Sequence, residues 1–232
     1  MKRLVMGIAA ALVGLAVTVA ATPASAAPNP TSLDAAKKLT VARIDGRLAV
    51  LKVDQSEVHN ATRLTDSHRS TLDGILSHDI QGLTDLKTKV QNETTLEAVK
   101  ADAQSMVNDY RVYLLVGPQV RITIAADVEN AAEGTLEKAY SALSTAIDNA
   151  QKAGKDVTAA KAKLADMRTQ LDSAKSNLSG VADGILAVKP GPDADAIHAA
   201  VNSARTKVKT VRGNLHDAAA DAKAIRDLLK AS

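Results

Sequence analysis

The chain contains no cysteine, tryptophan or phenylalanine, and its only aromatic residues are three tyrosines. Without cysteine it can form no disulfide and cannot be lipidated at a lipobox cysteine, so the fold must depend on its apolar core. The shortage of aromatic rings argues against functions that stack bases or sugars, namely single-stranded nucleic-acid binding and glycoside hydrolysis. It also argues against insertion of an amphipathic helix into a membrane surface.

Sequence motifs of catalysis are missing as well. There is no glycine-rich phosphate loop and no nucleophile elbow, and Ser77-His78-Asp79 are adjacent residues that would face different ways on a helix. No two of the five histidines are three or four residues apart, so no helical pair can grip one metal ion. We therefore expect no enzyme, no cofactor and no metal site. The histidines are His59, His68, His78, His198 and His216.

The N-terminus has the pattern of a secretory signal. Lys2 and Arg3 precede an apolar run over 4–21, and Ala24-Ser25-Ala26 is a small-x-small cleavage site. This predicts a cleaved signal peptide over residues 1–26. The alternative is an uncleaved membrane anchor, for which the apolar run is at the short end.

The remaining chain is expected to be secreted or extracellular, free or retained non-covalently at the cell surface. A short flexible leader over 27–32 would precede the fold, and no second apolar run suggests a membrane span. Without Lys2 and Arg3, the 29 Lys and Arg fall to 27 against 26 Asp and Glu. A near-neutral chain has no global attraction to nucleic acid or anionic lipid.

The C-terminal part, residues 154–232, carries a heptad pattern. Apolar residues alternate at steps of three and four before and after a break at Lys189-Pro190-Gly191-Pro192-Asp193, which predicts an antiparallel helical hairpin with coiled-coil character. They are Val157, Ala160, Leu164, Met167, Leu171, Ala174, Leu178, Val181, Ile185 and Val188, then Ile197, Val201, Ala204, Val208, Val211, Leu215, Ala218, Ala222, Ile225 and Leu229.

The many Ala residues in this pattern bury little area, so the hairpin should pack on the helix before it. Gly154 and Asp156 suit a helix end followed by an N-cap, and so short a turn makes neighbours antiparallel. We expect helices over 118–153, 156–188 and 194–230 in an up-down-up order.

The N-terminal helices, within 33–153, are expected over about 33–59, 65–91 and from Thr95 onward. Gln55 takes a core-type position in the first of them. Between Tyr110 and Ala126, β-branched residues alternate around Gly117-Pro118, and two interpretations compete. One is a β-hairpin, and the other is a helix that stops at Gly117 and restarts at Pro118. We favour the second, because helical spacing continues for over twenty residues downstream.

Two groups of residues are candidates for contact with a partner. One candidate is a docking patch formed by Tyr110, Arg111, Tyr113 and Pro118. The alternative, which we favour, is that these residues form a core junction. In that case the tyrosines fill the wide end of the bundle and Arg111 reaches a carboxylate such as Asp109 or Asp127. Arg205, Lys209 and Arg212 could contact an anionic polymer. The alternative there, again favoured, is a solvated face, since Asp217, Asp221 and Asp227 follow closely.

Three short segments carry a resemblance to a known group of proteins. They are Tyr110-Arg111-Val112-Tyr113-Leu114-Leu115-Val116-Gly117-Pro118, the following Ala125-Ala126-Asp127, and the upstream Gly82-Leu83-Thr84-Asp85-Leu86-Lys87. Over about residues 40–150 the chain resembles uncharacterised exported α-helical proteins of actinobacterial type that have a YRVYxLVxP segment. The resemblance implies a secreted α-helical protein of unknown role and brings no catalytic residues.

These observations predict an all-α protein, an elongated up-and-down helical bundle with coiled-coil character. The leading functional hypothesis is a secreted, non-enzymatic structural or interaction protein of the cell envelope, which presents long helical faces to an envelope protein or polymer, or to itself. The alternative is a binding module with a groove between helices for an apolar ligand or an anionic envelope polymer. An enzyme ranks third.

Overall fold

The structure is a computed structural model that describes residues 32–231. No strand occurs in this range, so the predicted all-α bundle is confirmed and the alternative β-hairpin at 110–126 is wrong. The predicted signal peptide over 1–26 and nearly all of the leader lie outside the described residues. The described elements are α1 (Leu33–Asn60), α2 (Asp66–Asn92), α3 (Leu96–Asn108), the π-helical turn η1 (Val112–Val116), α4 (Gly117–Lys152), α5 (Thr158–Leu178), α6 (Val181–Ala187) and α7 (Ala194–Ala231).

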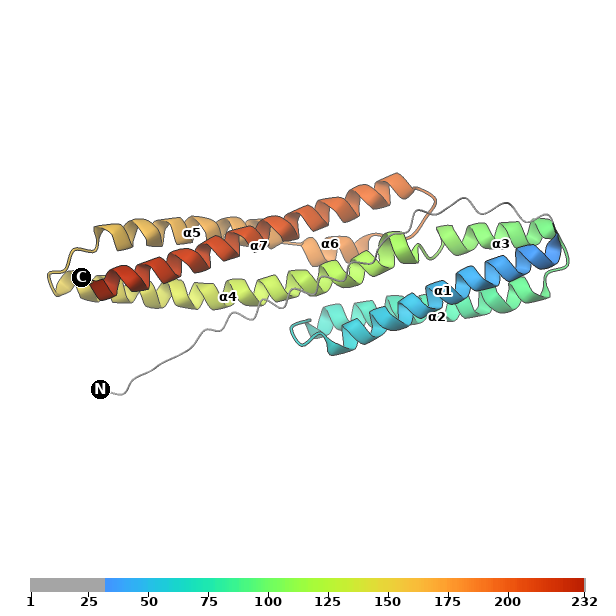
Figure 1. The fold of residues 1–232 in the computed structure, drawn as a ribbon, viewed down its shortest axis with the longest axis horizontal. Helices are drawn as coiled ribbons and strands as arrows, with labels where there is room; N and C mark the ends of the chain where they lie inside the picture. Colours follow the sequence, from blue (N-terminus) through green and yellow to red (C-terminus); the bar gives the residue numbers. More distant parts are fainter. Residues whose placement is uncertain (1–31, 232) are drawn as a thin grey trace.

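A spine runs along the long axis of the molecule, formed by α3 followed by α4 (Figure 1). The antiparallel hairpin of α1 and α2 lies beside α3 and the start of α4, at one end of the molecule. At the other end, α5 and α7 lie beside the rest of α4. The molecule is therefore elongated, and α4 alone, with its 36 residues, is about 54 Å long.

Each of the first three helices begins at a hydroxyl side chain that accepts a backbone N–H of its first turn. Such a cap satisfies one of the donors that a helix N-terminus leaves without a partner. The pairs are Ser32 with Ala35 (3.3 Å), Thr65 with His68 (3.3 Å) and Thr95 with Ala98 (3.2 Å). These caps explain why α1, α2 and α3 begin within two residues of the expected positions.

The turn between α1 and α2 is closed by Arg69. Its guanidinium donates to the carbonyl oxygens of Val58, His59 (3.3 Å) and Ala61 (2.7 Å), at the end of α1. The last carbonyls of a helix lack intrahelical donors, so this side chain satisfies them from the neighbouring helix.

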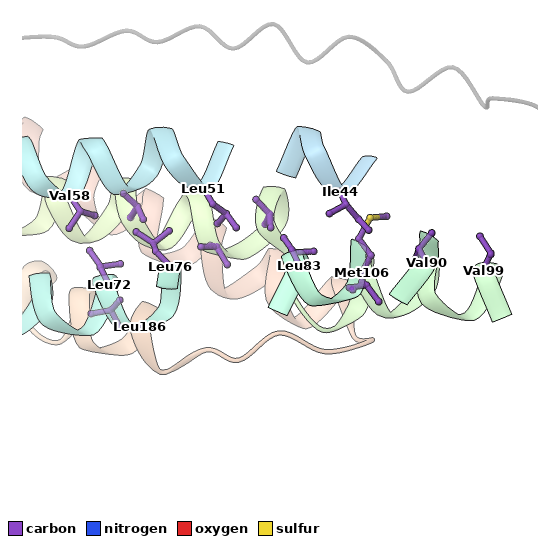
Figure 2. Packing of buried hydrophobic residues seen from close by; sticks show 14 of the residues in the cluster. Ile44, Leu51, Val58, Leu72, Leu76, Leu83, Val90, Val99, Met106 and Leu186 are labelled. Atoms are coloured by element: carbon purple, nitrogen blue, oxygen red, sulfur yellow. The ribbon is translucent and has the colours of Figure 1, made fainter. Parts of the chain in front are cut away.

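Three apolar clusters lie in a row along the molecule. The N-terminal core joins α1, α2 and α3 and includes Leu186 from α6 (Figure 2). A central cluster joins the start of α4 with α6 and the first half of α7, and the C-terminal core joins α4, α5 and the second half of α7. Large members of the N-terminal core are Ile44, Leu51, Val58, Leu72, Leu76, Leu83, Val90, Val99 and Met106.

The C-terminal hairpin packs on α4, and α5 packs against the second half of α7 in the C-terminal core. At the preceding turn Gly154 has a φ of +80°, a left-handed conformation that glycine adopts readily. The carboxylate of Asp156 then accepts the N–H of Thr158 at 2.9 Å. The coiled-coil character of the hairpin stays a prediction.

The predicted continuous helix over 156–188 is wrong, because it is broken between α5 and α6. Gly180 has a φ of +67°, which ends the regular helix, and α6 then lies beside the start of α4. The heptad pattern crosses this break unchanged, since Val181 and Ile185 are still buried, but in the central cluster rather than in the C-terminal core.

Two neighbouring glycines allow a matched test of this break. Gly180→Ala should lower the free energy of unfolding by about 1 kcal/mol, because a Cβ is disfavoured at left-handed φ. Gly184→Ala, in the exposed interior of α6 with open space around its Cβ position, should instead raise it by up to about 1 kcal/mol. Urea denaturation of both variants measures the two shifts, and equal signs would contradict the break.

The predicted helix stop at Gly117 is also wrong. The chain passes from η1 into α4 without interruption, and the actual break lies at Arg111, whose φ is +45°. The turn accommodates Pro118, which has no N–H, because the N–H of Gly117 bonds the carbonyl of Val112 in a π-type turn. Pro118 is then in the first turn of α4, where proline is favoured.

Candidate functional site

Arg111 ties the spine to the loop between α6 and α7. Its Nε donates to the carbonyl of Gly191 (2.7 Å), and its Nη2 donates to the carbonyl of Pro192 (2.9 Å) and to Oδ1 of Asn108 (3.1 Å). The expectation that Arg111 reaches Asp109 or Asp127 is therefore wrong. The backbone of Arg111 is left-handed, with a φ of +45°, a conformation that costs a residue with a Cβ about 1–2 kcal/mol. The three hydrogen bonds of its side chain hold Arg111 in this conformation.

The two tyrosines of this segment have different surroundings. Tyr110 is half-buried and lies over Gly82 of α2, where an added Cβ would come within 2.5 Å of the phenol oxygen. Tyr113 is 56 % exposed, so the expectation that both rings fill the interior is wrong for Tyr113. Pro118, the fourth residue of the group, is buried.

An exposed surface centred on Tyr113, here called the Tyr113 face, lies where η1 meets α1. The guanidinium of Arg47 stacks 5.1 Å from the ring centroid, and the phenol oxygen is 3.5 Å from the Cβ position of Gly46. Val53 follows Gly46 by seven residues, so it lies on the same face of α1, about 10 Å along the helix, and is 59 % exposed. The face thus combines an aromatic ring, a guanidinium and an aliphatic side chain.

The basic group on α7 is smaller than the sequence suggested. Arg212 donates from Nε to Oε1 of Glu129 at 2.8 Å, and Glu129 is buried on α4. This guanidinium therefore neutralises a buried carboxylate inside the fold. Arg205 and Lys209 are exposed.

A histidine between two carboxylates, not expected from the sequence, lies where α2 meets α4 and α6. Nδ1 of His68 is 2.9 Å from both carboxylate oxygens of Asp127, and Nε2 is 3.3 Å from Oδ1 of Asp183. His68 is on α2, whereas Asp127 is on α4, 59 positions later, and Asp183 is on α6, 115 positions later. Spacing in the sequence could therefore not have paired them. In the described part of the chain, no set of three His, Asp or Glu side chains has the arrangement of a metal site.

Buried aspartates occur on each N-terminal helix: Asp54, Asp79 and Asp102. Asp102 pairs with Lys89 (2.6 Å) and Asp54 with Arg121 (3.3 Å). One oxygen of each aspartate, Oδ2, has no hydrogen-bond partner among the described residues. Gln55, expected at a core-type position, is only half-buried, and its neighbour Asp54 takes the interior position.

Burial raises the pKa of two of these carboxyls. For Asp54 it outweighs the opposing charge of Arg121 and brings the pKa to about 6. For Asp79 it outweighs the opposing effect of His78 and also brings the pKa to about 6. Carboxyls with such values are candidates for general acid–base work. Different charged groups act on each, however, so the structure does not join these two into one site.

A surface hollow of about 360 Å³ lies between α5 and α7. Lys163 bridges it by pairing with Asp166 (3.1 Å) and Asp221 (3.0 Å). Its lining therefore has both signs of charge and is open to solvent. Between residues 32 and 231, no helix has the length and apolarity needed to cross a membrane.

Comparisons with protein-family models, with curated proteins and with solved structures find no match for the chain. The resemblance of the Tyr110–Pro118 segment to exported helical proteins therefore stays a prediction.

Proposed function

We propose that the protein is a non-enzymatic structural or interaction protein of the cell envelope, secreted from the cell. It acts by presenting long helical faces to a partner or to copies of itself. The N-terminal pattern of Lys2 and Arg3, an apolar run and Ala24-Ser25-Ala26 supports export. The elongated all-α bundle supports the presentation of helical faces, because a rod exposes more surface than a sphere of the same mass.

The observation that carries this proposal is the Tyr113 face. Tyrosine and arginine are over-represented among the residues that dominate binding energy at protein interfaces. The other two tyrosines are half-buried: Tyr110 lies over Gly82, and Tyr140 lies under the guanidinium of Arg168. Tyr113 instead projects beside Arg47, whose stacking holds the ring in one place and lowers the entropy cost of binding.

The alternative of a groove that binds an apolar ligand or an anionic envelope polymer has less support. Arg212 is committed to Glu129, which leaves Arg205 and Lys209 as the exposed members of the candidate anionic contact. The hollow between α5 and α7 is lined by Lys163 and three aspartates, which suits neither ligand.

Photo-crosslinking tests the proposal at the Tyr113 face. With p-benzoylphenylalanine in place of Tyr113, irradiation in an envelope fraction of the producing cells should give a discrete covalent adduct. If copies bind each other, the purified protein alone should give an adduct of twice the mass.

The matched control places the same group at Lys209, which is exposed on α7 outside the Tyr113 face and belongs to the candidate polymer contact. We expect no adduct there. An adduct at 209 and none at 113 would favour the alternative function, and no adduct at either position would contradict the proposal.

A further inference from the structure

The short helix α6 lies between the two ends of the molecule and contacts both. Leu186 is buried in the N-terminal core, where it lies beside Leu72 of α2 (Figure 2). Val181 and Ile185, on the other side of α6, are buried in the central cluster with α4 and α7. The helix therefore bridges the α1–α2 hairpin and the C-terminal part of the bundle.

Both ends of α6 are breaks in the chain. Gly180, at left-handed φ, separates it from α5, and residues 188–193 separate it from α7. Its C-terminal end is held by Gln119, which is buried on α4 and donates from Nε2 to the carbonyls of Ile185 (2.8 Å) and Val188 (3.0 Å). The segment can thus move only if its side-chain contacts to α2, α4 and α7 are released.

The N-terminal half of α6 is held by the side chain of His68 on α2. The charged groups that face this imidazole are Asp127 from α4 and Asp183 from α6. Asp127 is buried and also accepts the N–H of Thr65 at 2.7 Å, whereas Asp183 is 84 % exposed. The ring is 17 % exposed, so it lies mostly beneath the surface but within reach of solvent protons.

The two contacts together require both ring nitrogens to carry a proton. Carboxylates only accept hydrogen bonds, and a neutral imidazole has one N–H. Burial opposes the charged ring, but the hydrogen bonds and charges of Asp127 and then Asp183 outweigh it, so the pKa of His68 is raised above its ordinary 6.5. When the ring is neutral, the buried Asp127 keeps the remaining N–H and a lone pair of Nε2 faces the carboxylate of Asp183.

We propose that α6 is a strap across the two ends of the bundle and that His68 is its proton-operated latch, closed when both ring nitrogens are protonated and released from Asp183 when Nε2 loses its proton. A raised folded-state pKa gives stability that is fully present below the unfolded value of 6.5 and is lost as pH rises through the folded value. The strap is therefore closed in mildly acidic surroundings and loosened in alkaline ones, where Leu186 leaves the N-terminal core more often.

Hydrogen exchange of the intact protein between pH 5.5 and 8.5 tests the latch. After correction for the chemical exchange rate, the ratio of protection in α6 to protection in α2 should fall by about three- to tenfold over this range. The reference in α2 matters because Asp54 and Asp79 ionise partly in the same range and affect the whole N-terminal core. A constant ratio in the wild-type protein would overturn the proposal.

Asp183→Asn is the decisive variant, since an exposed residue can be changed without unfolding the chain. An amide can accept from a protonated ring and donate to a neutral one, so the protection ratio should become independent of pH. Retention of the wild-type fall would overturn the latch. His216→Gln, at an exposed histidine on α7, should keep that fall.

The ring itself supplies a second readout by NMR. The His68 imidazole should titrate above 6.5 in the wild-type protein and at a lower pH in Asp183→Asn. A wild-type value at or below 6.5 would overturn the proposal, whatever the exchange data.

Discussion

Asp79→Leu is expected to stabilise the protein by about 2 kcal/mol at pH 7.5. Asp79 lies three residues after Leu76 and four before Leu83, so it occupies a position of the apolar seam of α2 and is buried there. Leucine has the same number of side-chain heavy atoms and a similar branched shape, so it fills the position without a cavity. It also removes a carboxylate oxygen that has no hydrogen-bond partner in the described structure.

The gain should depend on pH, because burial raises the pKa of Asp79 to about 6, above the ordinary unfolded value. Between about pH 4 and 6 the folded chain holds a proton that the unfolded chain has lost, so wild-type stability falls as pH rises through this window. Burial also raises the pKa of Asp54 to about 6, so the ionisation of Asp54 lowers wild-type stability over the same window. The stabilisation by Asp79→Leu should thus be smaller at pH 4 than at pH 7.5.

Urea unfolding at the two pH values measures this difference. The matched control is Asp73→Leu, at an exposed aspartate of the same helix, which should change the free energy of unfolding by less than about 0.5 kcal/mol. Destabilisation by Asp79→Leu at pH 7.5 would mean that this carboxylate makes a favourable interaction, and the burial argument would be wrong.

Leu171→Ala should lower the free energy of unfolding by about 2–5 kcal/mol. Leu171 is completely buried in the C-terminal core. Many neighbours there are alanines, such as Ala174, Ala218 and Ala222, which bury little area, so a few large side chains supply most of the apolar burial.

Hydrogen exchange would locate the damage. In Leu171→Ala, protection in α5 and α7 should fall more than protection in α1 and α2, whose core is a separate cluster. Leu228→Ala, at a leucine that is 37 % exposed, serves as the control and should have a small effect. An equal loss of protection in both ends of the molecule would contradict the separation of the cores.

The sequence predicted the helices and their order because that information is local. Spacings of three and four, the caps at Thr65 and Thr95, and the Gly154–Asp156 turn each depend on residues a few positions apart. The break at Gly180 could not be predicted in the same way, since Gly184 and Gly213 lie inside helices. Which glycine adopts left-handed φ is decided by tertiary packing, here the contact of α6 with the N-terminal core and the central cluster.

The surfaces were harder to predict than the fold. Arg111 bonds backbone carbonyls 80 and 81 residues away, which leave no mark on the sequence. Tyr113 was expected inside the bundle, and its exposure follows from the π-type turn of η1, which an apolar run does not reveal. The buried aspartates did leave a signal in the spacing: Asp54, Asp79 and Asp102 each lie three residues after one buried apolar residue and four before the next.

Small-angle X-ray scattering of the protein in dilute solution tests most directly the claim that a single α3–α4 spine carries both ends of the molecule. The spine, residues 96–152, is about 85 Å long at 1.5 Å per residue, and a rod of that length has a radius of gyration of about 25 Å. We predict a value near this and a skewed distance distribution. A compact protein of this size would have a radius of gyration of about 16 Å. That value, with a symmetric distribution, would contradict the rod and the exposure of its helical faces.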